Sequence, residues 1–134
     1  MEKITTDLLV IGAGSGGLSV AAGAVQMGAR VVLLEGHEMG GDCLNYGCVP
    51  SKALLAAGHA AHAVTQGASM GITAPAPKID YAAAKAHVAR TIAHIAPVDS
   101  QERFEGLGVR VIRDFGQFTG PRTVVAGAHE ITAR

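Results

Sequence analysis

Net charge is what this sequence most clearly lacks, since its 11 basic residues are balanced by 11 acidic residues over 134 positions. It has no basic cluster either, so binding to nucleic acid or to an anionic membrane surface has no electrostatic support. The hydrophobic share of 49% is enough for one domain with a core of its own. We therefore expect a soluble α/β domain without a nucleic-acid partner.

The sequence also lacks a convincing membrane-spanning or signal segment. Residues 8–25 carry no charge, but they contain five glycines, and no basic segment precedes them. We expect no membrane contact and a cytoplasmic location.

Cysteine is scarce, and Cys43 and Cys48 are the only two in the chain. So small a number does not fit a secreted domain stapled by disulfides. No further cysteine or histidine lies at a spacing suited to zinc, and the six histidines have no carboxylates or cysteines converging on them. We expect no metal site, and we interpret the histidines as solvated residues on helix surfaces.

A glycine motif marks the start of the segment that contains most of the candidate functional residues. The apolar run 7–11 ends at Gly12, Gly14 and Gly17, which form the pattern GxGxxG, and a helix of small residues and a second strand at 29–34 follow. Gly12 suits a tight turn, Gly14 lets the backbone approach a pyrophosphate, and Gly17 allows close packing of helix on strand. Glu35 then stands where a carboxylate accepts hydrogen bonds from a ribose hydroxyl. This order of elements predicts a dinucleotide site.

The two cysteines follow this site directly and are five positions apart. Residues five apart in an ideal helix have Cα atoms about 8.6 Å apart, whereas a disulfide needs about 4.4–6.8 Å. A bridge therefore requires a distorted backbone, and the glycines at 40, 41 and 47 allow it. Regular helix is expected to begin near Pro50, which leaves Cys48 at a helix N-terminus with Lys52 one turn away, a setting that favours thiolate. We interpret the pair as redox-active; the alternatives are buried inert cysteines or a stabilising bridge.

The rest of the chain is interpreted as scaffold. The predicted helices cover 51–66, 81–95 with Asp80 as N-cap, and a short segment with a capping box formed by Asp99 and Glu102. A third parallel strand is expected at 109–112. The segments 115–118, 124–125 and 130–132 are expected to form a small antiparallel excursion, with turns near Gly120 and Gly127.

Together, residues 12–35 and 40–52 resemble the FAD domain of the class I pyridine nucleotide-disulfide oxidoreductases, which include dihydrolipoamide dehydrogenase, glutathione reductase and mercuric reductase. Pro50-Ser51-Lys52 is more similar to the dihydrolipoamide dehydrogenase and mercuric reductase branches, and residues 99–109 resemble bacterial proteins labelled mercuric reductase-like. Two positions depart from the family pattern. Asp42 replaces a usual threonine, and Tyr46 replaces a usual small apolar residue.

The resemblance implies an α/β fold, namely a Rossmann-like FAD-binding domain in three layers with a parallel sheet and a small antiparallel excursion. It places residues 1–134 as the N-terminal, incomplete part of that domain, without the NAD(P)-binding and dimerisation domains of a homodimeric parent. It implies FAD as cofactor and NAD(P)H as co-substrate. The cofactor-binding residues would be Gly12, Gly14, Ser15, Gly16, Gly17, Glu35, Gly36, Gly41, Asp42, Cys43, Lys52 and Gly116.

The resemblance also implies the roles of the residues expected to be catalytic. Cys48 would be the thiolate nearest the flavin, Cys43 the thiol that exchanges with a small disulfide or a Hg(II) substrate, and Lys52 a positive charge beside the flavin. For Gly116, a structural role in the bend after the third strand remains an open alternative to contact with FAD. The alternative function is a nucleotide-binding module with structural cysteines and no turnover of its own.

Overall fold

A three-stranded parallel sheet forms the middle of the protein. The computed structural model describes residues 1–134, and this sheet contains β2 (Leu8–Ile11), β3 (Val31–Leu34) and β4 (Arg110–Ile112) in the order β2-β3-β4. All four residues of the central strand β3 are buried. An uninterrupted apolar run of this kind is typical of a parallel strand covered on both faces.

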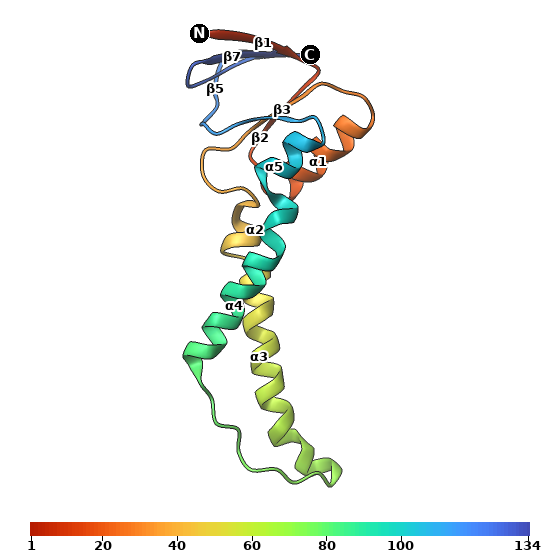
Figure 1. The fold of residues 1–134 in the computed structure, drawn as a ribbon, viewed down its shortest axis with the longest axis vertical. Helices are drawn as coiled ribbons and strands as arrows, with labels where there is room; N and C mark the ends of the chain where they lie inside the picture. The colour runs from red at the N-terminus through yellow and green to blue at the C-terminus, as the bar shows by residue number, and fades with distance from the viewer.

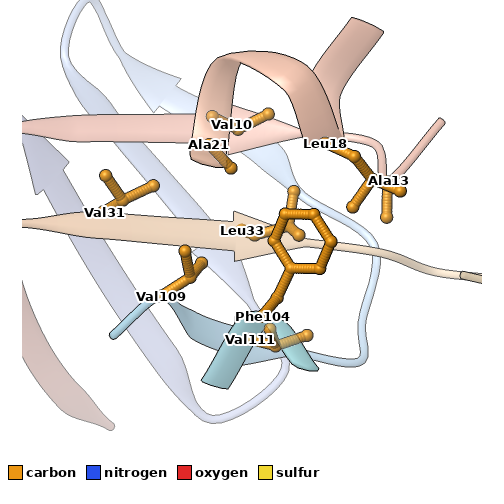
Figure 2. Close-up of a cluster of buried hydrophobic side chains, with 9 residues drawn as sticks. All are labelled: Val10, Ala13, Leu18, Ala21, Val31, Leu33, Phe104, Val109 and Val111. Atoms are coloured by element: carbon orange, nitrogen blue, oxygen red, sulfur yellow. The ribbon is translucent and has the colours of Figure 1, made fainter. Parts of the chain in front are cut away.

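Helices α1 (Ser15–Gln26) and α5 (Gln101–Gly106) cover one face of this sheet. Figure 2 shows the ring of Phe104 beside Leu33 in the cluster that joins them. Phe104 is 2% exposed and Leu33 is fully buried, so α5 is anchored by one aromatic side chain in spite of its short length. The buried members of this cluster are Val10, Ala13, Leu18, Ala21, Val31, Leu33, Phe104, Val109 and Val111.

A second sheet covers the opposite face. It contains β1 (Glu2–Thr6), β5 (Gln117–Gly120), β6 (Thr123–Ala126) and β7 (His129–Ala133) in the order β1-β7-β6-β5. One face of the parallel sheet packs against this second sheet. The residues in this contact are Val32 and Leu34 of β3, Ile112 of β4, and Val124, Ala126 and Ile131 of the second sheet. The three layers are therefore helices, parallel sheet and mostly antiparallel sheet, which confirms the expected fold class.

Strand β1 was not anticipated from the sequence, and the reason is its remote partner. It pairs in parallel with β7, with Lys3 opposite Glu130 and Ile4 opposite Ile131. The three expected antiparallel segments are present as β5, β6 and β7. The excursion is thus part of a mixed sheet that also includes the N-terminal strand.

Two long helices form an arm that extends away from the three layers (Figure 1). Helix α3 (Cys48–Gln66) and helix α4 (Tyr81–Ile95) pack along each other, and each has a single buried residue, Ala53 and Val88 respectively. None of the helices combines the length and the apolar character needed to span a bilayer.

The helix ends show which of the expected caps form. Asp80 caps α4 by accepting a hydrogen bond from the Ala83 amide at 3.0 Å, as expected. Helix α3 ends at Gln66 with Gly67 as its C-cap, as expected, and the chain continues as the 3₁₀ helix η1 (Gly67–Met70). Asp99 ends the 3₁₀ helix η2 (Ala96–Asp99), so the cap of α5 is its neighbour Ser100, which accepts from the Arg103 amide at 3.2 Å.

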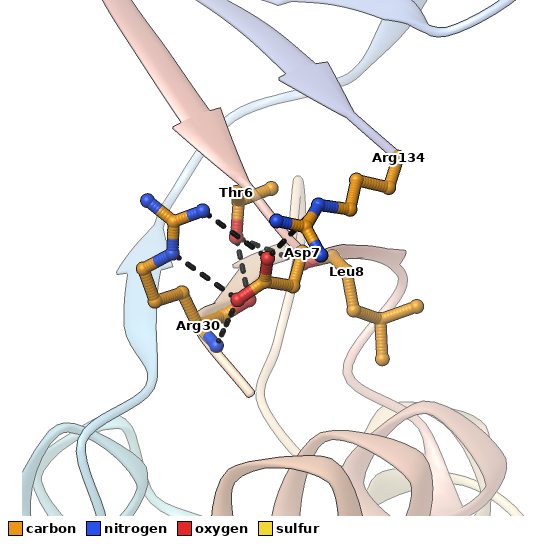
Figure 3. Close-up of polar contacts among 5 residues, drawn as sticks. All are labelled: Thr6, Asp7, Leu8, Arg30 and Arg134. Atoms are coloured by element: carbon orange, nitrogen blue, oxygen red, sulfur yellow. Dashed lines mark hydrogen bonds and ion pairs between the residues drawn. The ribbon is translucent and has the colours of Figure 1, made fainter. Parts of the chain in front are cut away.

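Asp7 joins the two sheets at the point where β1 passes into β2. Its carboxylate accepts hydrogen bonds from the Arg30 backbone amide at 2.9 Å and from two nitrogens of the Arg30 guanidinium at 3.1 Å. Arg134 lies on its other side, with Nε 3.4 Å from Oδ1 (Figure 3). Buried Thr6 donates to the Arg30 carbonyl at 2.7 Å and completes the junction.

This junction makes stability depend on pH in the acid range. The hydrogen bonds from the Arg30 side chain and backbone lower the pKa of Asp7 from 3.8 to about 2. Because the folded-state pKa is depressed, the stabilisation is present above the unfolded pKa and is lost as pH falls from about 4 to 2. In urea unfolding at several pH values, Asp7→Asn should remove this part of the acid slope. Arg30→Gln should reduce it, and an Asp7→Asn slope parallel to that of the wild type would contradict the assignment.

Candidate nucleotide and dithiol site

The glycine loop after β2 turns the chain sharply into α1. Gly12 has φ +101°, a conformation that other residues rarely adopt. A Cβ on Gly17 would lie 1.9 Å from the Gly12 carbonyl oxygen, so α1 can approach the end of β2 only without a side chain at that position. These are the tasks predicted for Gly12 and Gly17.

Gly14 differs from both, because the fold itself does not require a glycine there. It is the N-cap of α1 with φ −77° and ψ −179°, and no other part of the chain lies within 4 Å of where its Cβ would be. Ser15 and Gly16 are the first two residues of the helix, and no side chain caps its free amides. The open space and the free amides together suit a pyrophosphate at the helix N-terminus.

Glu35, at the end of β3, holds the glycine loop in place. Its carboxylate is largely buried, and its two oxygens accept from the Ala13 amide and the His37 amide, each at 2.7 Å. The sequence predicted an acceptor for a ribose hydroxyl but not these backbone partners. Each carboxylate oxygen has two lone pairs, so Glu35 can still accept a further hydrogen bond from a ligand.

The short helix α2 (Gly41–Asn45), which carries Cys43, is docked on the glycine loop. The Gly40 amide donates to the Ala13 carbonyl at 2.9 Å, and a Cβ on Gly41 would lie 2.8 Å from the Gly14 Cα. The side-chain amide of Asn45 donates to the Gly41 carbonyl at 2.9 Å and to the Met39 carbonyl at 3.1 Å, which fixes the turn. The sequence did not predict α2 or the role of Asn45, although it singled out both cysteines as functional residues.

The two thiols lie close together on either side of the turn between α2 and α3. Cys43 is half-buried, Cys48 is exposed, and both are free thiols. Cys48 is the first residue of α3, as expected from the position of Pro50. The hydrogen bond with Cys48 and partial burial raise the pKa of Cys43, while the charge of Lys52 opposes this change. The structure therefore brings together all three residues that the sequence marked as catalytic.

An open cleft of about 670 Å³ lies beside α2. Three of its lining residues are carboxylates, none is lysine or arginine, and the two departures from the family pattern, Asp42 and Tyr46, both belong to it. The lining consists of Glu35, His37, Glu38, Gly41, Asp42 and Tyr46. An anion in this cleft would have to rely on backbone amides.

Two of the predicted cofactor residues have packing reasons to be glycine. A Cβ on Gly36 would lie 2.5 Å from the Phe115 ring, and one on Gly116 would lie 2.8 Å from Leu34 Cδ1 and 3.0 Å from Val124 Cγ1. These contacts account for both glycines without a ligand. For Gly116 they strengthen the structural alternative.

Arg113 and Phe115 contact Glu35 and His37, two residues that line the cleft. The sequence did not predict this role for either residue. Arg113 donates to the carbonyls of His37 and Glu35, the latter at 3.4 Å. The Phe115 and His37 rings meet edge to face with centroids 4.9 Å apart. The only signal in the sequence was their position directly after a strand, at the edge where ligands of parallel sheets bind. No group of three histidine, cysteine, aspartate or glutamate residues is placed to hold a metal ion.

One known protein family matches almost the whole of this chain. The profile described as pyridine nucleotide-disulphide oxidoreductase matches residues 6–134. The chain belongs to this family. Membership implies FAD and NAD(P)H as cofactors and confirms the resemblance found from the glycine motif and the dithiol.

Relatives of this chain include several dihydrolipoyl dehydrogenases. That of Thermus scotoductus is 36% identical over 124 residues, or 90% of this chain and 26% of that protein. The chloroplastic dihydrolipoyl dehydrogenase 2 of Arabidopsis thaliana is 34% identical over 131 residues, or 96% of this chain and 23% of that protein. The Bacillus subtilis enzyme is 49% identical over 78 residues, or 58% and 17%. The chain thus spans about a quarter or less of the length of these relatives.

Proposed function

We propose that residues 1–134 are the N-terminal part of an FAD-binding domain, and that the whole protein is an NAD(P)H-dependent disulfide oxidoreductase. The observation that carries this proposal is the docking of α2, with Cys43, on the glycine loop through Gly40 and Ala13. A dithiol fixed beside a dinucleotide motif is suited to the exchange of electrons with a bound redox cofactor. FAD would supply two-electron transfer between NAD(P)H and the Cys43–Cys48 disulfide.

The residues present fit FAD, because the space beside Gly14 is open and the carboxylate of Glu35 lines the adjoining cleft. The amides of Ser15 and Gly16 would hold the pyrophosphate, and Glu35 would accept from a ribose hydroxyl. Glu35 also disfavours a 2′-phosphate at this site. Lys52 would place positive charge near the thiol pair.

For the thiols, the raised pKa of Cys43 supports a division of roles. Cys43 keeps its proton to higher pH than an ordinary thiol and loses it before it attacks a disulfide. Cys48, the first residue of α3, would be the thiol nearest the cofactor. Reduction of the Cys43–Cys48 disulfide to two thiols would take up two electrons and two protons. Cys43 then attacks a disulfide substrate and releases one thiol, and Cys48 resolves the mixed disulfide and releases the second.

The relatives named above favour a small disulfide of the lipoamide type as substrate. A Hg(II) substrate, in a mercuric reductase-like enzyme, is the alternative that the segment 99–109 suggested. We propose a homodimer for the whole protein. A protein that binds the nucleotide but whose thiols do not oxidise reversibly would instead be the binding module considered from the sequence.

The proposal is tested by Gly14→Ala, which should separate binding from folding. The new Cβ meets nothing in the protein and its backbone angles are ordinary, so the free energy of unfolding should change by no more than about 1 kcal/mol. The methyl group would occupy the space assigned to the pyrophosphate, so FAD affinity, measured by flavin fluorescence, should fall at least about tenfold, or 1.4 kcal/mol.

The matched control is Gly23→Ala in the same helix, where an added Cβ also has free space. It should bind FAD as the wild type does. Equal FAD affinity in Gly14→Ala and Gly23→Ala would refute the pyrophosphate site at Gly14.

Asp42→Thr should strengthen FAD binding rather than weaken it. Asp42 adds a third carboxylate to the cleft that adjoins the proposed site of the dianionic pyrophosphate, and one charge pair at about 4 Å in water corresponds to about 1 kcal/mol. Titration at low salt should show the gain, and added salt should reduce it. Asp42→Asn removes the charge at nearly constant shape and should behave similarly. Weaker binding in both variants would mean that Asp42 itself holds the ligand.

A further inference from the structure

Tyr46 makes a contact that the proposed function does not use. It lies between the two cysteines in the sequence, and its hydroxyl donates a hydrogen bond to Oε2 of Glu38 at 2.7 Å. Tyr46 is 72% exposed, and both residues line the cleft. The bond therefore joins two residues that line the cleft, and it is exposed to solvent and not part of a packed core.

Glu38 belongs to the well-anchored side of the cleft. Its neighbour His37 is held by the Glu35 carboxylate, by Arg113 and by the Phe115 ring. The Glu38 carbonyl accepts from the Gly41 amide at 3.1 Å. The acceptor for Tyr46 is thus fixed relative to β3 and β4.

The dithiol turn follows α2, which the Asn45 side chain holds to Met39 and Gly41. Tyr46 is the C-cap residue of α2, where its amide donates to the Asp42 carbonyl at 2.9 Å. Gly47 separates it from α3. The hydroxyl of Tyr46 adds a side-chain bond from this turn to Glu38. We propose that Tyr46 is a positioning residue, which holds the turn between Cys43 and Cys48 in place through Glu38 and so keeps Cys43 half-buried beside Cys48.

This inference rests on the proposed function for its purpose, since the turn would have to present both thiols to a cofactor and to a substrate. The contact itself does not depend on the cofactor. Asp42 and Glu38 favour the protonated phenol, because the hydrogen bond and the charge of Glu38, followed by burial and the charge of Asp42, raise the pKa of Tyr46. The donor therefore remains available throughout the neutral range.

Alkylation of the two thiols provides the main test, with Cys48 as the internal reference. Tyr46→Phe keeps the ring and removes the donor. The ratio of Cys43 to Cys48 alkylation rates, determined by peptide mapping after iodoacetamide treatment of the protein without flavin, should rise about two- to tenfold, the range expected for the loss of one hydrogen bond. Glu38→Ala should have the same effect, whereas Glu38→Gln, which keeps an acceptor oxygen, should stay close to the wild type.

An unchanged ratio in Tyr46→Phe would overturn the proposal, as would equal rises in Glu38→Gln and Glu38→Ala, since these would implicate the charge of Glu38 and not the bond. A second readout tests the bond directly. The chain contains two tyrosines and no tryptophan, so in a Tyr81→Phe background tyrosinate absorbance reports Tyr46 alone. Glu38→Ala should lower its titration midpoint, and an unmoved midpoint would also overturn the proposal. Both tests are made without FAD, so a failure to bind FAD would refute the proposed function and leave this inference standing.

Discussion

Replacement of either cysteine by serine should abolish disulfide turnover in the full-length enzyme, but the two flavin spectra should differ. Cys43→Ser should leave Cys48 as a permanent thiolate, and a long-wavelength thiolate-to-flavin absorption band should then be present without reductant. Cys48→Ser should lack this band while its flavin stays bound and reducible by NAD(P)H. The physical basis is the position of Cys48 at the start of α3 and the raised pKa of Cys43.

Flavin content serves as the control for this pair, since both variants should retain it. The spectra are decisive because the two thiols are equivalent for turnover, where each is needed to form or resolve the mixed disulfide. A band in Cys48→Ser and none in Cys43→Ser would exchange the two roles. The absence of a band in both variants would refute electron transfer between the flavin and this dithiol.

Gly17→Ala should have the largest effect on the fold. The Cβ would lie 1.9 Å from the Gly12 carbonyl oxygen and 3.2 Å from a Val10 methyl group, so α1 must move away from β2. Overpacking against a backbone atom should lower the free energy of unfolding by about 3 kcal/mol, which urea denaturation would measure. FAD binding should be lost as well, because the helix N-terminus moves.

Gly23→Ala is again the matched control, with an added Cβ in open space in the middle of α1. It should be as stable as the wild type or more stable by about 0.5–1 kcal/mol, since alanine favours helix. If Gly17→Ala were equally stable, the close approach of α1 to Gly12 would not exist in solution.

The sequence was sufficient for features whose cause is local or motif-based. Gly12 and Gly17 have the geometry that the GxGxxG pattern predicts, Cys48 begins a helix near Pro50, and Asp80 caps α4. Each of these depends on neighbours within a few residues. A resemblance carried by the same residues was enough to identify the family.

Features that depend on distant partners were not predictable in this way. The docking of α2 requires Gly41 to meet Gly14, and Glu35 is engaged by two backbone amides that are fixed only by the folded loop. Ser100 replaced Asp99 as the cap because η2 includes Asp99, so α5 begins one residue later than the capping box implies. The bond between Tyr46 and Glu38 likewise depends on how α2 is oriented.

The parallel pairing of β1 with β7 has a consequence for the order of folding. The inner strands β2 and β3 are joined by a single helix, so they can pair after a short loop closure. Strand β1 is synthesised first, yet its partner is β7, so almost the whole sequence must be enclosed before Lys3 meets Glu130. Long-range closure of this kind is slow because chain entropy is lost before the contacts form. Until then β1 is an unpaired edge, and its charged residues Glu2 and Lys3 hinder association with other chains.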